Sequence, residues 1–237
     1  MSAARLLAVM AAATLALSAC SKSADIDARI HDYILAHPEI IQQAMNKLQA
    51  QQDAADAAKA KVAINQYRQA IERDPRDFVA NPGGKITLTE FYDYRCPHCI
   101  NAAASVLRII HDDPDVRVVF KEFPIFGATS EHAAAAAIAL KDKGGDELGL
   151  YQDMMNTRPL DDAAIDRIAR AHGVDPGVLD HGPIREQAQA QILAVRKLAI
   201  DLGIEGTPAF IVGDTLVPGD DTSAVTQAIA QARNQHG

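Results

Sequence analysis

The sequence is poor in several kinds of residue, and each shortage narrows the possible functions. Tryptophan is absent, and aromatic residues make up 5% of the 237 residues. Lysine and arginine form no cluster and the formal net charge is -8 at pH 7, which argues against a nucleic-acid partner. Beyond the N-terminal segment no apolar run is long enough to cross a bilayer, so we expect no internal membrane span. With 48% hydrophobic residues, the chain can still build a sizeable core.

Cysteine is also scarce, and the first of the three cysteines lies in a segment typical of export signals. Arg5 precedes an apolar run over residues 6–17, and small residues then lead to Cys20. We expect residues 1–19 to be a signal peptide that ends in one of two ways. Either the cut falls near Ala19 and Cys20 is incidental, or the segment is a bacterial lipobox and lipid on Cys20 anchors the chain to a membrane. We favour the lipobox, and both alternatives predict export to the periplasm or cell envelope.

Cys96 and Cys99 are then the two cysteines that remain in an oxidising compartment, where disulfides persist. A disulfide between residues three apart closes too short a loop to stabilise a chain of this size. The pair is therefore predicted to take part in chemistry rather than to hold the fold together.

The leader, residues 20–76, has a helical pattern. Apolar residues at helical spacing predict one helix over residues 25–36 and a second from Pro38 to about Glu72. The apolar stripe thins along the second helix, and a lone helix with so little apolar surface is marginal in water. Two hypotheses remain open: a solvated spacer, or a weak coiled coil that makes a homo-oligomer through residues 25–75. We lean slightly towards the oligomer.

The remainder, residues 80–235, alternates strands and helices. Apolar periodicity and turn signals predict strands at residues 85–90, 116–120, 209–212 and 215–217, and helices at residues 101–110, 130–141, 146–156, 161–172, 183–202 and 221–231. Ser130, and Asp161 or Asp162, are the expected N-caps. The order is β-α-β, a block of helices, then α-β-β-α. We therefore predict an α/β protein: a thioredoxin fold with a helical insertion at about residues 128–182, preceded by the extended N-terminal helical segment.

Cys96 lies where the first predicted strand ends and the first helix begins, and it is the candidate nucleophile. Unpaired N–H groups and the positive end of the helix dipole stabilise a thiolate there. Pro97 suits the first helical turn because it lacks an N–H, and His98 adds a nearby donor or positive charge. A stabilised thiolate makes the Cys96–Cys99 disulfide a good oxidant. Cys99, one turn further on, is expected to be more buried and to resolve mixed disulfides.

Metal binding is the main rival function for the Cys96–Cys99 pair. A structural zinc ion needs four ligands, and the sequence has no second cysteine pair and no closely spaced histidine pair, so we predict no metal site of this kind. Two thiolates suit Cu(I), so a copper-binding module remains an alternative from another class of function. A third possibility is a mainly structural lipoprotein, in which the long helix rather than the cysteine pair carries the function.

Two further features bear on the site. Glu90 ends an apolar strand, and it is either a solvated edge carboxylate or, in a thioredoxin fold, an acid beneath the active site that shuttles protons to Cys99. Lys121, on the adjacent predicted strand, is the expected charge partner of Glu90. Thr207 and Pro208 stand just before a strand, where proline is disfavoured unless the strand begins there or the bond is special. Spacing alone does not assign a cis bond.

Three stretches, taken together, resemble the DsbA-like family of thiol:disulfide oxidoreductases. They are FYDYRCPHC at residues 91–99, FKEFPI at residues 120–125 and GIEGTPAF at residues 203–210. The resemblance covers roughly residues 80–235. In the leader, YILAHPEII at residues 33–41 is similar to the helical-leader, ScsC-like branch of the family.

The resemblance implies roles that spacing alone does not assign. It implies that the bond between Thr207 and Pro208 is cis, and that this segment packs beside Cys96 and offers backbone groups to an extended substrate. It also implies that Glu90 is the family's buried acid. Threonine before the proline departs from the valine of the best-known oxidases and is shared with isomerase-type relatives, so the direction of exchange stays open.

We therefore predict an exported enzyme that exchanges disulfides with unfolded or misfolded proteins and needs no organic cofactor. As an oxidase it would pass the Cys96–Cys99 disulfide to a substrate. As an isomerase or reductase, reduced Cys96 would attack a substrate disulfide. An oligomer favours isomerisation, because several active sites can face one substrate. A membrane or periplasmic redox partner is expected to restore the starting state.

Overall fold

The computed structural model describes residues 25–236, and the chain divides into two units, residues 1–56 and residues 57–237. The predicted signal peptide and Cys20 lie outside the described residues. Within the described range, no helix is long and apolar enough to cross a membrane.

The described part of the first unit is helical, as predicted. Residues 25–36 form one helix, the helix breaks at His37, and α2 (Glu39–Glu72) begins directly after Pro38. Apolar side chains in this unit, such as Ile30 and Met45, are largely exposed to solvent. An exposed and incomplete apolar stripe is compatible with both hypotheses for the leader, the spacer and the coiled coil.

Five strands form one mixed sheet: β1 (Phe78–Ala80), β2 (Ile86–Tyr92), β3 (Val116–Glu122), β4 (Ala209–Val212) and β5 (Thr215–Pro218). Their order is β1-β3-β2-β4-β5; β2 and β3 run parallel, and the other neighbours are antiparallel. A parallel pair needs a crossover connection, and α3 (Pro97–Asp112) supplies it. This arrangement confirms the predicted thioredoxin fold. The edge strand β1 was not predicted, because three residues are too few to show a period of two.

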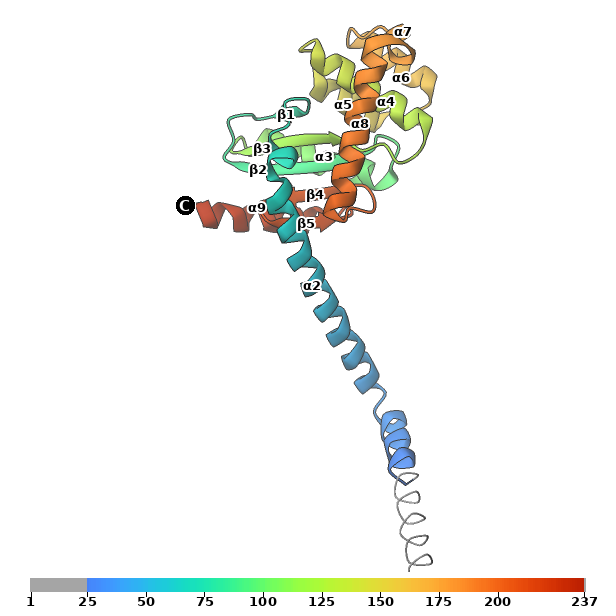
Figure 1. The fold of residues 1–237 in the computed structure, drawn as a ribbon, viewed down its shortest axis with the longest axis vertical. Coiled ribbons are helices and arrows are strands. Elements are labelled where there is room, and N and C mark those ends of the chain that lie inside the picture. The colour runs from blue at the N-terminus through green and yellow to red at the C-terminus, as the bar shows by residue number, and fades with distance from the viewer. Residues whose placement is uncertain (1–24, 237) are drawn as a thin grey trace, which may run out of the picture. The chain divides into compact units, whose positions relative to one another are not determined.

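The remaining helices are α4 (Ala128–Asp142), α5 (Glu147–Asn156), α6 (Asp162–Ala171), α7 (Gly177–Asp180), α8 (Gly182–Leu202) and α9 (Thr222–His236). The helices from α4 to α7 gather on one side of the domain, and α8 returns from them to the sheet (Figure 1). This is the predicted helical insertion. The chain then forms the β4–β5 hairpin through Gly213 and Asp214 and ends in α9.

The period of two in the strands divides the core between the two faces of the sheet. Leu88 and Phe120 belong to the larger core, which α3, α9 and the insertion cover. Phe91 belongs to a smaller core on the opposite face, together with side chains of α8 and α2. Ile64 and Ile71 of α2 are 1% and 0% exposed in this smaller core. Residues 57–72 are therefore part of the packing of the domain.

The two predicted N-caps have different outcomes. Asp161 caps α6, since its Oδ1 accepts a hydrogen bond from the Ala164 N–H at 2.8 Å. The expectation for Ser130 is wrong, because α4 begins earlier and Gly127 is its N-cap. Gly127 has φ +85°, a conformation that favours glycine. Ser130 instead lies in the first turn and is buried.

Candidate functional site

Cys96 is the N-cap residue of α3, and its backbone is extended, with φ -73° and ψ 121°. Pro97 follows as the first helical residue, where its missing N–H needs no partner. The Cys96 Sγ lies 3.1 Å from the Thr207 carbonyl oxygen, to which its thiol form donates. Hydrogen bonds from the Cys99 thiol and from the N–H groups of Cys99 and His98 lower the pKa of Cys96 to about 5. The local sequence thus places a thiolate at the start of the helix.

Cys99 lies one helical turn after Cys96, and its pKa is shifted in the opposite direction. Its side chain is fully buried, and its Sγ accepts a hydrogen bond from the Asp93 N–H at 3.5 Å. Burial raises the pKa of Cys99 well above its usual range, and the neighbouring Cys96 and Glu90 add to the rise. Cys99 therefore keeps its proton at a pH where Cys96 has lost its own.

His98 points to solvent and forms an ion pair that the sequence did not reveal. Its Nδ1 lies 3.1 Å from Oδ2 of Asp220, in the loop between β5 and α9. Asn101 donates to the same oxygen at 3.3 Å. The carboxylate raises the pKa of His98, and the negative charge of Cys96 contributes in the same direction. A cationic His98 in turn favours the thiolate form of Cys96.

The peptide bond between Thr207 and Pro208 is cis, as the family resemblance implied. The Thr207 carbonyl oxygen contacts the Cys96 sulfur. The Pro208 carbonyl oxygen accepts a hydrogen bond from the Gly219 N–H at 2.8 Å. A hollow of about 300 Å³, lined by residues 203–209 and the end of β5, adjoins this segment. The segment just before β4 therefore forms one wall of the site.

Asp93 joins the loop before Cys96 to the loop that follows β3. Its Oδ1 accepts from the Arg95 N–H at 2.8 Å, and its Oδ2 accepts from the N–H groups of Ile125 and Phe126 at 2.7 and 3.0 Å. The side chains of Ile125 and Phe126 remain 42% and 47% exposed beside the site. One carboxylate thus fixes two loops that lie about thirty residues apart in sequence.

Glu90 is buried beneath the site, as the resemblance implied. It is 0% exposed, and its carboxylate accepts from the Tyr151 hydroxyl at 3.3 and 3.5 Å. Burial raises the pKa of Glu90 to about 8, although the hydrogen bond from Tyr151 opposes the rise. Glu90 is close enough to Cys99 to raise the pKa of that thiol. It can therefore exchange a proton near neutral pH within reach of the deeper sulfur.

The expected ion pair between Glu90 and Lys121 is wrong. In the parallel register of β2 and β3, Glu90 is paired with Phe120, so Lys121 points to the opposite face of the sheet. There the Lys121 Nζ donates to the Asp77 carboxylate and to the Ala70 carbonyl oxygen. Lys121 therefore anchors the end of α2 rather than taking part in the site.

Three polar partners in the site were not found from the sequence: Asp220, Asp93 and Tyr151. Each of the three contacts a partner that lies more than twenty residues away in the sequence, so no local pattern relates the two residues. A carboxylate directly before the cysteine loop was the only local signal for Asp93. In the part of the chain that the structure describes, no group of three or more histidine, cysteine or acidic residues is arranged to hold a metal ion.

Known families match the chain in two separate parts. The DSBA-like thioredoxin domain matches residues 87–230, and the copper resistance protein ScsC N-terminal domain matches residues 23–55. Thiol:disulfide interchange protein DsbA of Bordetella parapertussis is 28% identical over 169 residues, which cover 63% of this chain and 78% of that protein.

Solved structures show the same likeness. A thioredoxin-like oxidoreductase from Silicibacter pomeroyi is 36% identical, with a TM-score of 0.64 over 70% of this chain and 98% of that one. BcfH of Salmonella enterica Typhimurium is 25% identical, with a TM-score of 0.71 over 92% of this chain and 99% of that one.

Longer relatives match over part of their length. The Na+/H+ antiporter NhaA 1 of Salinispora arenicola is 29% identical over 175 residues, which cover 68% of this chain. The chain spans about a quarter of the length of this antiporter, 26%. The match that covers most of the domain is the DSBA-like one, which includes both cysteines and the cis proline. Because this match covers more than half of the chain, the chain belongs to the DSBA-like thioredoxin family of thiol:disulfide oxidoreductases.

Proposed function

We propose that this protein exchanges disulfides with exported polypeptides through Cys96 and Cys99. The observation that carries the proposal is the difference between the two thiols. The pKa of Cys96 is lowered to about 5, whereas that of the buried Cys99 is raised. A low pKa makes Cys96 both a good leaving group and a thiolate at neutral pH, and it favours the reduced enzyme.

In the oxidising direction, a substrate thiolate attacks Cys96 Sγ of the enzyme disulfide. The Cys96–Cys99 bond breaks, its electron pair goes to the Cys99 sulfur, and that sulfur takes a proton. Glu90 is the donor that we assign to this step, because its pKa of about 8 leaves it mostly protonated at neutral pH. A second substrate thiolate then attacks the substrate sulfur of the mixed disulfide, which releases the Cys96 thiolate and the oxidised product.

The backbone beside Pro208 is the proposed substrate-binding edge. The Thr207 carbonyl already accepts from the Cys96 thiol, so an extended substrate chain laid along this segment would bring its sulfur to Cys96. Ile125 and Phe126, whose N–H groups bind Asp93 of the loop before Cys96, offer exposed apolar side chains. This combination suits an unfolded polypeptide, which presents both backbone and apolar side chains.

Two features favour a second direction, isomerisation. Threonine precedes the cis proline, and an ScsC-type domain precedes the thioredoxin domain. In that direction reduced Cys96 attacks a substrate disulfide, and another substrate thiolate then displaces Cys96. We propose that residues 25–75 make a homo-oligomer that places several Cys96 thiolates around one substrate. A redox partner in the periplasm or membrane would keep the pair in the required state.

The proposed location is the periplasm or cell envelope. Support comes from the apolar N-terminal segment and from the likeness to DsbA proteins. Lipid on Cys20 would hold the protein at a membrane. Mass spectrometry of the protein purified from membranes tests this: lipidation predicts a diacylglyceryl-modified Cys20 as the first residue, and an unmodified N-terminus would reject it.

The catalytic assignment is tested by two single substitutions. Cys96→Ser should abolish oxidation of a reduced model protein and refolding of a scrambled one, whereas Cys99→Ser should accumulate mixed disulfides at Cys96. The assays are run beside a size measurement in solution, which decides between monomer and oligomer. Full oxidase activity of Cys96→Ser would overturn the assignment. A copper-binding module without exchange activity would instead bind Cu(I) stoichiometrically and fail both assays.

A further inference from the structure

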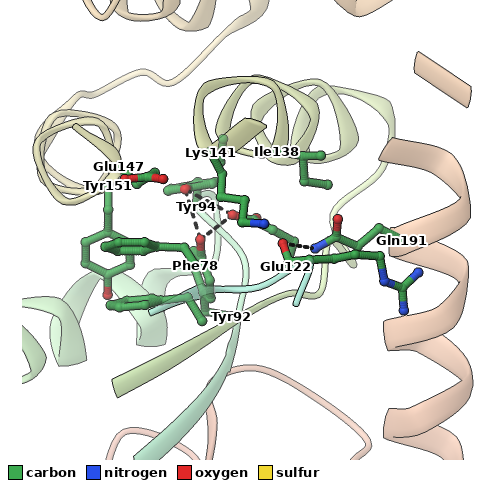
Figure 2. Close-up of a pocket in the computed structure, with 12 residues that line it drawn as sticks. Phe78, Tyr92, Tyr94, Glu122, Ile138, Lys141, Glu147, Tyr151 and Gln191 are labelled. Atoms are coloured by element: carbon green, nitrogen blue, oxygen red, sulfur yellow. Dashed lines mark hydrogen bonds between the residues drawn. The ribbon is translucent and has the colours of Figure 1, made fainter. Parts of the chain in front are cut away.

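A second buried carboxyl lies on the same face of the sheet as Glu90, and the exchange mechanism above does not use it. Glu122 is the last residue of β3 and is paired in register with Tyr92, the last residue of β2. Its Oε1 accepts from the hydroxyls of Tyr92 and Tyr94, the latter at 3.2 Å, and the two hydroxyls lie 2.9 Å apart. Figure 2 shows these three groups turned toward one another. The three oxygen atoms thus form a triangle, in which the two hydroxyl protons make two hydrogen bonds at a time.

This triangle holds the loop that carries the nucleophile. Tyr94 is 2% exposed and stands two residues before Cys96, so its hydroxyl anchors that loop to the end of β3. Asp93, the neighbouring residue, contacts the loop after Glu122 through the N–H of Ile125. The loop before α3 is therefore attached at two points, to the end of β3 through Glu122 and to the loop after β3 through Asp93.

Aromatic rings separate Glu122 from Glu90. The Tyr151 ring lies 5.3 Å from that of Tyr92 and 6.1 Å from that of Tyr94, measured between centroids. Its hydroxyl turns away from Glu122 (Figure 2). That hydroxyl donates to Glu90 at 3.3 Å. Both carboxyls are buried in this apolar cluster, where water does not screen their charges, and the charge of Glu90 raises the pKa of Glu122. Repulsion between two charges acts on both, so an ionised Glu122 must also oppose ionisation of Glu90.

Few charges face Glu122 from the elements that pack around it. From β2 and the following loop these are Glu90 and Asp93, both of which raise its pKa. Among the residues around the small cavity beside it, α4 contributes Lys141 and α5 contributes Glu147. The remaining charged residue there, Arg76 before β1, is paired with Asp74.

Lys141 donates to the Pro75 carbonyl, and no ion pair to Glu122 is found among the described residues. Burial raises the pKa of Glu122 to about 8 despite the two tyrosine donors.

The cavity supplies what the protonated form of Glu122 needs. It holds about 20 Å³, enough for one water molecule, and Gln191 of α8 lines it. The Gln191 Oε1 is buried without a partner, although its amide nitrogen donates to the Arg76 carbonyl at 3.1 Å. The tyrosine hydroxyls can donate to an ionised Glu122. The cavity that Glu122 lines also holds an acceptor without a partner, and a protonated Glu122 has a proton to donate.

We propose that Glu122 is a second proton-binding site of this enzyme: a positioning residue that holds the Cys96 loop through Tyr94 and sets the proton affinity of Glu90 by its charge. The proposal rests on the exchange function proposed above, in which Glu90 serves Cys99. When Glu122 ionises, its charge makes Glu90 hold its proton more tightly, because two like charges in one apolar cluster repel. The two carboxyls therefore titrate as a pair.

The test compares the full chain with Glu122→Gln, Glu90→Gln and the matched control Glu147→Gln. Glu147 lines the same cavity but is only half-buried, so the same chemical change there should have no effect. Carbon-13 NMR of labelled glutamate carboxyls gives each midpoint directly. We expect both Glu90 and Glu122 to titrate above pH 7 in the wild type. In Glu122→Gln, the Glu90 midpoint should fall by about half a pH unit or more.

The second measurement is the rate at which Cys99 releases a bound thiol from Cys96, as a function of pH. The rate should rise through the Glu90 midpoint in the wild type, rise at lower pH in Glu122→Gln, and lose this rise in Glu90→Gln. Tyr94→Phe is the second variant: loss of one donor to the ionised form should raise the Glu122 midpoint while the carboxyl remains.

The inference is overturned if Glu122 titrates below about pH 5, or if Glu122→Gln leaves both the Glu90 midpoint and the rate profile unchanged. If Glu122→Gln does not fold, the wild-type titration and Tyr94→Phe still decide: an unshifted Glu122 midpoint in Tyr94→Phe counts against the proposal. A wild type that exchanges no disulfides would refute the proposed function, and the NMR midpoints would still report on Glu122.

Discussion

At the start of α3, the Cys96 sulfur lies against the Thr207 carbonyl and the first N–H groups of the helix, while the Cys99 sulfur lies one turn deeper in the core. The thiolate of Cys96 depends most on a hydrogen bond from Cys99. The two residues are therefore a pair in which the deeper thiol keeps its proton and uses it to stabilise the charge on Cys96 at the start of the helix.

The first prediction concerns the loss of the Cys99 thiol as a hydrogen-bond donor to Cys96. In Cys99→Ala the pKa of Cys96 should rise from about 5 by about one to two units, since a hydrogen bond to a charged group is worth about 1.5–3 kcal/mol. The helix N–H groups remain, so the pKa should stay below that of a free cysteine. Ultraviolet absorbance of the thiolate across a pH series measures it. An unchanged midpoint would show that the helix terminus alone stabilises the thiolate.

What the sequence predicts at this scale depends on whether a contact is local. Cys96, Pro97 and Cys99 stand within one helical turn, so a strand-to-helix boundary placed them correctly. His98 meets Asp220 across 122 residues, and no periodicity or motif relates the two. Long-range side-chain partners are fixed by the folded topology, and this is why the ion pair was not predicted.

At the scale of elements, β3 has a different partner on each face. Phe120 and Glu122 point toward the insertion, whereas Lys121 points toward α2. The sequence placed Lys121 and Glu90 on adjacent strands, which is true, but only the register shows that they face opposite sides. A shift of one residue in a strand exchanges its faces, so charge partners across strands are the least secure sequence inference.

The buried pair of Lys121 and Asp77 is the subject of the second prediction. Both side chains are 1% exposed, and Lys121→Met would leave Asp77 buried without a cation. The free energy of unfolding should fall by about 3–5 kcal/mol, as is typical when one member of a buried ion pair is removed. Denaturant unfolding measures the loss. Lys85→Met, at an exposed position before β2, is the matched control and should change little.

A double variant separates the ion pair from simple packing. If the unpaired charge causes the loss, Lys121→Met with Asp77→Asn should be more stable than Lys121→Met alone. Burial already raises the pKa of Asp77 to about 6, so the single variant should also recover stability at low pH. Equal stability of the single and double variants would argue that Lys121 acts only through its cap on the Ala70 carbonyl.

At the scale of the whole molecule, the third prediction concerns the residue at which the thioredoxin domain begins. Ile64 and Ile71 are buried in the smaller core, so a chain that starts at residue 57 should fold and retain Cys96 reactivity. A chain that starts at residue 73 loses both side chains and should be less stable by about 3–6 kcal/mol. Thermal unfolding of the two truncations makes the comparison. If the leader makes the oligomer, the first truncation should also be a monomer with reduced isomerase activity.

The fourth prediction is a pH dependence of stability. Glu90 and Glu122 have pKa values of about 8 in the folded protein and ordinary values near 4.5 when unfolded. Between pH 4.5 and 8 the folded state binds more protons than the unfolded state. The contribution of these two carboxyls to the free energy of unfolding is therefore fully present below about pH 4.5, and it is lost as the pH rises through 8. Each carboxyl contributes a slope of up to about 1.4 kcal/mol per pH unit.

The oxidised protein is the form to measure, because the Cys96 thiolate of the reduced form acts in the opposite sense. Its pKa is lowered to about 5, so it favours the folded state increasingly as pH rises from 5 towards 9. Denaturant midpoints of the oxidised protein from pH 5 to 9 should fall steadily, and Glu90→Gln with Glu122→Gln should flatten the curve. A rise in stability over this range would show that the two carboxyls are ionised in the folded protein.

The junction between α2 and the β4–β5 turn has a mechanical consequence. Lys61 pairs with Asp214 at 3.1 Å, Arg68 binds the same carboxylate, and Arg68 also donates to the Gly213 carbonyl at 3.2 Å. These contacts hold the last turns of α2 against the hairpin. Because β4 begins directly after Pro208, that hairpin is continuous with the peptide bond that faces Cys96. The last turns of α2 therefore brace the same hairpin that carries the proposed substrate-binding edge.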